Sequence, residues 1–169
     1  MNLNVYYEGQ KAGELECTRQ GLYYLYRAAC GIRTDIPLRL YTVCGMRSVK
    51  IGVLSKEGEL TKKLSVREAG ETPVYAVLGR EDDGFLPWCG TVDGELLTDA
   101  YLRADGNTAM LAIPAKEGQA LPLIAYAAQM EPCSVCGRDC LALQLTDGRP
   151  QLPEEPEKSE EPKELAEPE

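Results

Sequence analysis

Apolar and polar residues alternate with a period of two along much of the first half of the chain. Leu38, Leu40 and Thr42 occupy every second position of one such segment, and the same pattern returns in residues 48–54. This alternation is typical of β-strands that turn one face toward a core. It predicts strands near residues 3–8, 14–18, 22–26, 38–43, 48–54 and 59–66. Residues 66–69 are either a helical turn or the frayed end of a strand.

The second half has fewer regular patterns but clear turns. Asp93-Gly94 is a typical hairpin turn, and it lies between the apolar pairs 91–92 and 96–97. We expect further strands at 73–78, 108–113 and 140–145, while residues 98–102 form either a strand or a short helix. The apolar run 121–130 predicts a buried strand interrupted near Pro122, with a helix as the alternative because the run is rich in Ala.

These elements together predict a mostly β fold. About ten to twelve short strands, with turns every ~8–12 residues, are typical of an antiparallel sandwich or a barrel-like sheet. Two small packed β units are the third possibility. We therefore expect one β domain over residues 1–150, with a possible internal division near residue 72.

Charge separates the end of the chain from the rest. Residues 151–169 contain eight Glu and two Lys, so they carry −6 of the total net charge of −9. With Pro throughout and almost no apolar residues, this segment is predicted to be a disordered acidic tail. The other 150 residues are nearly balanced at −3 and lack a basic surface for phosphates, so we expect no nucleic-acid partner.

The sequence contains no histidine, which removes several classes of chemistry. Ser–His and Cys–His nucleophilic pairs and zinc sites with imidazole ligands are excluded. Asp93, Asp99 and Asp105 lack the spacing of a calcium loop, and we expect them to be solvated turn residues. We therefore favour a non-catalytic protein.

Neither a signal peptide nor a membrane-spanning run is apparent. The longest apolar run, residues 123–128, is far too short to cross a bilayer. We therefore expect a cytoplasmic protein without a membrane partner, whose seven cysteines are reduced.

Three of those cysteines are close together in the sequence. Cys133, Cys136 and Cys140 have the spacing C-x2-C-x3-C, which could hold zinc if Cys17, Cys30, Cys44 or Cys89 supplied a fourth thiolate. The alternative is a hairpin loop joining the strands at 121–130 and 140–145, in which the cysteines are small apolar fillers. Apart from this possible zinc site we expect no cofactor.

Arginine and tyrosine residues suggest a second candidate site. Arg27, Arg39, Tyr24 and Tyr41, with Trp88, could form a sheet surface that binds a planar or anionic ligand or a protein. The alternative is that the arginines face solvent and cover tyrosine rings with their stems, while Trp88 anchors the core or forms a pocket wall.

Several short motifs resemble those of a group of small uncharacterised bacterial proteins. They are Gly21-Leu22-Tyr23, Arg39-Leu40-Tyr41, Cys44-Gly45, Gly52-Val53-Leu54 and Leu121-Pro122-Leu123. The resemblance covers most of residues 3–150 and implies a common fold but no activity. The sequence favours a non-catalytic binding or adaptor module that presents a β-sheet surface to a macromolecular partner, for which a protein is the candidate. The alternative is a small zinc protein, and the oligomeric state stays open.

Overall fold

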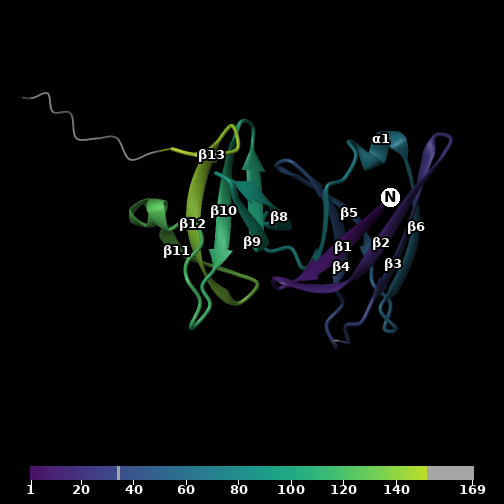
Figure 1. The fold of residues 1–169 in the computed structure, drawn as a ribbon, viewed down its shortest axis with the longest axis horizontal. Coiled ribbons are helices and arrows are strands. Elements are labelled where there is room, and N and C mark those ends of the chain that lie inside the picture. Colours follow the sequence, from purple (N-terminus) through teal and green to yellow (C-terminus); the bar gives the residue numbers. More distant parts are fainter. Residues whose placement is uncertain (34, 152–169) are drawn as a thin grey trace, which may run out of the picture.

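The computed structural model describes residues 1–33 and 35–151 and confirms a mostly β fold with two sheets. Figure 1 shows the sheets side by side along the long axis of the molecule. The first sheet contains β1 (Asn2–Tyr7), β2 (Gln10–Gln20), β3 (Tyr23–Cys30), β4 (Arg39–Cys44), β5 (Arg47–Val53), β6 (Glu59–Ser65) and β7 (Tyr75–Gly79). The second contains β8 (Leu86–Val92), β9 (Glu95–Asp105), β10 (Thr108–Pro114), β11 (Glu131–Val135), β12 (Arg138–Thr146) and β13 (Arg149–Pro150).

The first sheet curls into a nearly closed barrel. Its strand order is β5-β4-β7-β1-β2-β3-β6, and the two edge strands β5 and β6 also contact each other. The sheet is mixed rather than purely antiparallel, because β1 and β7 pair in parallel with Val5 opposite Ala76. A short helix, α1 (Val66–Ala69), begins with a capping box in which Ser65 and Glu68 satisfy each other's backbone N–H groups. Residues 66–69 therefore form a helical turn.

The second sheet is open, with the order β11-β12-β10-β9-β8 and β13 paired to β12. The predicted hairpin turn at Asp93-Gly94 is confirmed, with positive φ at both residues. Residues 98–102 belong to β9, so the strand alternative is correct there. The change from one sheet to the other falls between Gly79 and Leu86, rather than near residue 72.

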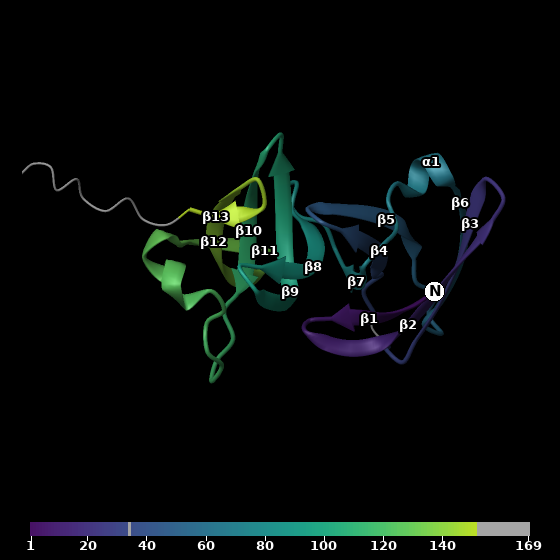
Figure 2. The same ribbon diagram turned by 45° about the horizontal axis from the view of Figure 1, so that its top comes forward.

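Two expectations for the second sheet need correction. Residues 121–130 are not a strand, because most of them form the 3-10 helix η1 (Ile124–Gln129), in line with the helical alternative. The hairpin expected at the cysteines is present, but it consists of β11 and β12 and turns at Cys136-Gly137, so its first strand is residues 131–135 rather than 121–130. Figure 2 shows η1 at the end of the molecule far from the first sheet.

Two main clusters of buried residues hold the fold together. One fills the interior of the barrel and includes Val5, Leu15 and Tyr26. The other lies between the sheets, where Tyr41 and Val77 from the first sheet pack with residues of the second. Strands β4 and β7 are therefore buried on both faces, whereas the alternation predicted only one buried face.

The sheets also approach closely at β8. Trp88 is 1% exposed, lies in the cluster between the sheets and donates from its indole N–H to the carbonyl of Gly45 at 2.8 Å. A side chain at Gly90 would collide with the Trp88 ring, so this glycine makes the position of the indole possible. Within the described residues, no helix combines the length and apolar character that crossing a membrane requires.

Candidate binding cleft

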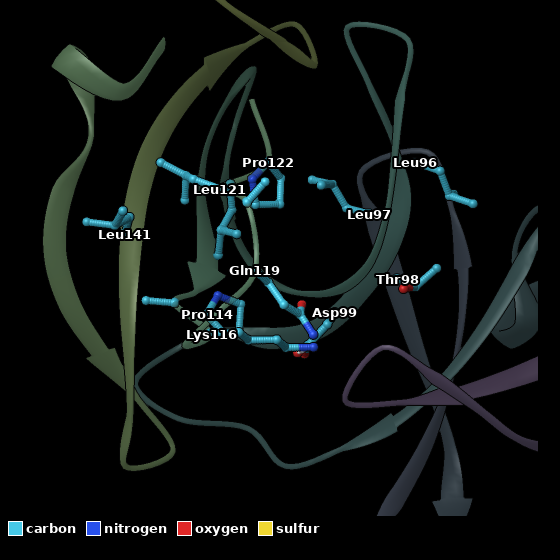
Figure 3. A pocket seen from close by; sticks show the side chains of 13 residues that line it. Leu96, Leu97, Thr98, Asp99, Pro114, Lys116, Gln119, Leu121, Pro122 and Leu141 are labelled. Carbon is cyan, nitrogen blue, oxygen red and sulfur yellow. Dashed lines mark ion pairs between the residues drawn. The ribbon is translucent and has the colours of Figure 1, made fainter. Parts of the chain in front are cut away.

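A cleft of about 320 Å³ lies on the second sheet. It is bounded by β9, by the segment 113–122 that leaves β10, and by β12. Leu97, Ile113, Leu121, Pro122 and Leu141 supply apolar walls. In Figure 3 the side chains of Leu97, Leu121 and Pro122 lie above a lower end where polar groups gather. The cleft is therefore amphipathic, with an apolar body and one polar end.

The polar end consists of Lys116, Asp99 and Gln119. The Lys116 ammonium lies 2.9 Å from a carboxylate oxygen of Asp99 and donates to the backbone carbonyl of Glu8 at 3.0 Å. Gln119 is exposed, and its side chain points toward the same end of the cleft in Figure 3. Hydrogen-bond donors are thus available beside the apolar walls.

Arg138 completes the ionic group on the other side of Asp99. Its guanidinium donates two hydrogen bonds to the carboxylate, at 2.9 and 2.7 Å, and a third to the hydroxyl of Tyr101 at 3.2 Å. Such a two-bond arrangement fixes both the distance and the orientation of the pair. Because the Asp99 side chain is only 12% exposed, this ion pair forms a rigid base for the cleft.

The same ionic group links the two sheets. The turn between β1 and β2 reaches the second sheet, where the carboxylate of Glu8 lies 4.0 Å from Arg138 and the hydroxyl of Thr98 donates to the carbonyl of Gly9 at 3.3 Å. A smaller cavity of about 90 Å³, also lined by Asp99 and Arg138, lies at this junction. The cleft is therefore held in place by contacts from both sheets.

The pKa of Asp99 reflects its two cationic neighbours. Burial alone raises this pKa, but hydrogen bonds from Arg138 and Lys116 outweigh burial and hold it below its ordinary value. The pKa of Arg138 is raised, chiefly by its hydrogen bonds to Asp99. Asp99 is thus a firmly ionised, fully paired carboxylate, which makes it a poor general base.

Asp99 is the acidic residue that lines the cleft, and further acidic residues lie next to its lining residues in the chain. Glu117 is exposed on the segment that lines it, and Glu95, next to Leu96, accepts a hydrogen bond from the backbone N–H of Leu123 at 3.1 Å. Asp93 accepts a hydrogen bond from the hydroxyl of Tyr126 at 2.8 Å. Residues 80–151 contain five basic and eleven acidic residues, a net charge of −6, whereas residues 1–79 contain eleven basic and eight acidic residues, a net charge of +3. The cleft thus belongs to the acidic half of the molecule.

A larger hollow exists in the first sheet but is a weaker candidate. It measures about 880 Å³ and is lined by residues 32–33, 35–38 and 53–57, mostly outside the strands. The cleft on the second sheet is smaller, but regular strands and paired charges position its walls.

The five predicted surface residues are not gathered on one exposed face. Tyr41 and Trp88 are buried between the sheets, where the hydroxyl of Tyr41 donates to Glu81 at 2.6 Å. Arg39 lies 3.4 Å from the same Glu81 carboxylate. Tyr24 and Arg27 belong to β3, where an odd sequence separation places them on opposite faces.

The three clustered cysteines lie in the β11–β12 hairpin. Cys133 lies directly opposite Cys140, and Cys136 occupies the turn, where its backbone N–H donates to Asp82 at 2.7 Å. All three pack against a small apolar cluster that includes Phe85. Burial raises the pKa of each of the three thiols, to about 11 for Cys140. All seven cysteines are free, and in residues 1–33 and 35–151 no three His, Cys, Asp or Glu side chains are grouped so as to hold a metal ion.

Sequence reasoning missed the residues of the cleft. Asp99 was expected to be a solvated turn residue, but it lies inside β9 and is paired with Arg138 and Lys116. One signal in the sequence indicated that Asp99 is paired. It interrupts a strand of mainly apolar residues, where an acid needs a partner. The position of that partner, 39 residues later in the chain, could not be read from the sequence.

A scan against protein-family models, a search of curated proteins and a search of solved structures each found no match to this chain. The resemblance to small bacterial proteins therefore stays an expectation. The functional argument rests on the cleft itself.

Proposed function

We propose that the protein is a non-catalytic binding module that accepts an apolar group of a protein partner in the cleft on its second sheet. The observation that carries this proposal is the cleft, in which apolar walls meet a polar end built on a paired carboxylate. Apolar pockets with a few fixed polar groups are typical ligand sites. The binding surface expected from the sequence thus moves from the N-terminal tyrosines to the second sheet.

The electrostatics favour binding over catalysis. A general base needs an accessible group with a pKa near the working pH, whereas Asp99 has a lowered pKa and is bonded to two cations. The pKa of Tyr101 is raised by burial, so its hydroxyl stays protonated. Asp99 is therefore suited to holding Lys116 in place at the polar end of the cleft, and Tyr101, which lines the smaller neighbouring cavity, supports Arg138.

Exposed apolar residues beside the cleft favour a protein over a small molecule. Leu96, which lines the cleft, is 51% exposed, and Ile124 is 70% exposed. Both adjoin the hydrogen bond between Glu95 and Leu123, so apolar surface continues beyond the cleft on one side. A macromolecule can cover Ile124 together with the cleft, whereas a ligand that fits within about 320 Å³ would contact Leu96 in the cleft wall and leave Ile124 exposed.

A peptide-display selection on the intact protein tests this proposal. Ala120 is exposed and lines the cleft, so Ala120→Trp fills the cleft without removing any core residue. Ala29 is exposed on β3 of the first sheet, which makes Ala29→Trp a matched control. We expect the native protein and Ala29→Trp to bind the same selected peptides, while Ala120→Trp binds them at least tenfold more weakly. Failure to select any peptide, or equal binding by all three proteins, would refute the proposal.

A further inference from the structure

Resting on the function proposed above, we infer that the occupant of the cleft is a basic protein segment that inserts one aliphatic side chain and places Lys or Arg residues on either side of it. The first argument is size. The cleft of about 320 Å³ is at the lower end of the range of ligand pockets, roughly 300 to 1,000 Å³, so it suits a small occupant such as one side chain with its adjoining backbone. Leucines on three sides make an aliphatic anchor the natural fit.

The second argument is hydrogen bonding at the polar end. A lysine ammonium has three N–H donors, and the described contacts of Lys116 use two of them, to Asp99 and to the carbonyl of Glu8. The amide of Gln119 points toward the same end. A backbone carbonyl next to the anchor side chain would accept from these donors, which is how an extended segment is oriented in a cleft.

The third argument is charge. Asp99 and Glu8 offset Lys116 and Arg138, so the ionic base of the cleft is close to neutral. Glu95 and Glu117 directly adjoin the lining residues Leu96 and Lys116 in the chain, and they belong to residues 80–151, which carry a net charge of −6. Complementary charge speeds encounter and rejects partners of the wrong sign, so a basic segment is favoured and an acidic one is repelled.

Binding of four short peptides with blocked ends tests the inference, with nuclear magnetic resonance titration as the readout. The peptides are Lys-Arg-Leu-Arg-Lys, an acidic version Glu-Asp-Leu-Asp-Glu, a neutral version Ser-Gly-Leu-Gly-Ser, and Lys-Arg-Gly-Arg-Lys, which lacks the anchor. We expect the basic leucine peptide to bind at least tenfold more tightly than the acidic one and measurably more tightly than the other two. Its binding should weaken as salt is added.

Two charge-reversal variants locate the effect. Glu117→Lys should weaken binding of the basic leucine peptide at least threefold, because it reverses an exposed charge next to Lys116, which lines the cleft. Glu59→Lys makes the same change on β6 of the first sheet and should leave the affinity unchanged. Equal weakening by both variants would show attraction to the whole molecule and would overturn the inference.

The remaining outcomes separate this inference from the proposed function. If the leucine peptides bind equally whatever their charge, and Ala120→Trp abolishes that binding, the binding module stands and the basic partner is wrong. If no leucine peptide binds and display also yields none, the proposed function itself fails.

A second copy of the chain is the competing occupant. Sedimentation that shows self-association lost in Ala120→Trp would assign the cleft to that copy and overturn the inference.

Discussion

The two sheets of this protein bury their apolar surface in different ways. The first closes on itself and fills its interior with its own side chains, such as Leu15 and Tyr26. The second sheet stays open, and one of its faces packs against Tyr41, Val43 and Val77, which belong to the first sheet. A filled barrel has little room for a ligand among its strands, and the hollow of about 880 Å³ beside it lies mostly outside them, whereas an open sheet can leave a cleft at its border. The comparison explains why the candidate site lies on the second sheet.

The largest expected effect concerns the core between the sheets. Trp88→Ala removes the biggest side chain of that core and should lower the free energy of unfolding by about 3–5 kcal/mol. Because this core contains residues of both sheets, amide hydrogens in β4 and β7 should exchange faster, as well as those in β9. Leu15→Ala, inside the barrel, is the comparison. If Trp88→Ala loosens the second sheet alone, the sheets are less dependent on each other than the shared core implies.

A smaller loss is expected at the ionic junction. Asp99→Asn keeps the shape of the side chain but leaves Arg138 and Lys116 without their carboxylate, which should cost about 2–3 kcal/mol in urea unfolding. Asp105→Asn makes the same change at an exposed position of the same strand and should stay within about 0.5 kcal/mol. Equal effects would show that the junction does not stabilise the fold.

The difference in unfolding free energy between the native protein and Asp99→Asn should depend in part on pH. The pKa of Asp99 is lower in the folded protein than its ordinary value of 3.8, so its stabilising contribution is complete above that value. It is lost as the pH falls through 3.8 toward the lower folded pKa. The gap in stability between the native protein and Asp99→Asn should therefore be constant from about pH 7 to 5 and shrink below about pH 4. A gap that widens in acid would contradict the assigned pairing.

The smallest expected effect is that of one hydrogen bond between the sheets. Thr98→Val removes the hydroxyl that donates to the carbonyl of Gly9 and should cost about 0.5–1 kcal/mol. Thr61→Val, on the exposed face of β6, should have no measurable cost. A loss several times larger for Thr98→Val would mean that the β1–β2 turn positions the second sheet more strongly than the ionic group does.

Most of the strands could be predicted from the sequence because alternation and turn residues are local signals. The hairpin turn at Asp93-Gly94 depends only on the positive φ of its two residues, and it is present as expected. Residues 121–130 were misread because a short apolar run has no periodicity that separates a strand from a buried helical turn. Residue pattern alone could not resolve that ambiguity.

The cleft and the double burial of β4 could not be predicted, since both depend on contacts between distant segments. Tyr41 looked like an outward residue of a strand with one buried face, but the second sheet covers it. Asp99 and Arg138 are 39 residues apart and belong to different hairpins. The local sequence pattern shows which residues alternate, but it does not indicate which surface of one sheet a second sheet will cover.

The parallel pairing of β1 with β7 also constrains the order in which the chain can fold during synthesis. Val5 meets Ala76, so the barrel cannot close until residues 75–79 have left the ribosome. Until then one edge of β1 has no partner strand, and bringing it to β7 closes a loop of about 70 residues, which is slow compared with forming a local hairpin. Most strand pairs of the second sheet are neighbouring hairpins that form locally, although β12 returns to β10 across residues 115–137. One face of this sheet packs on β4 and β7, which are synthesised first, so the N-terminal sheet provides the surface on which the later-synthesised sheet is assembled.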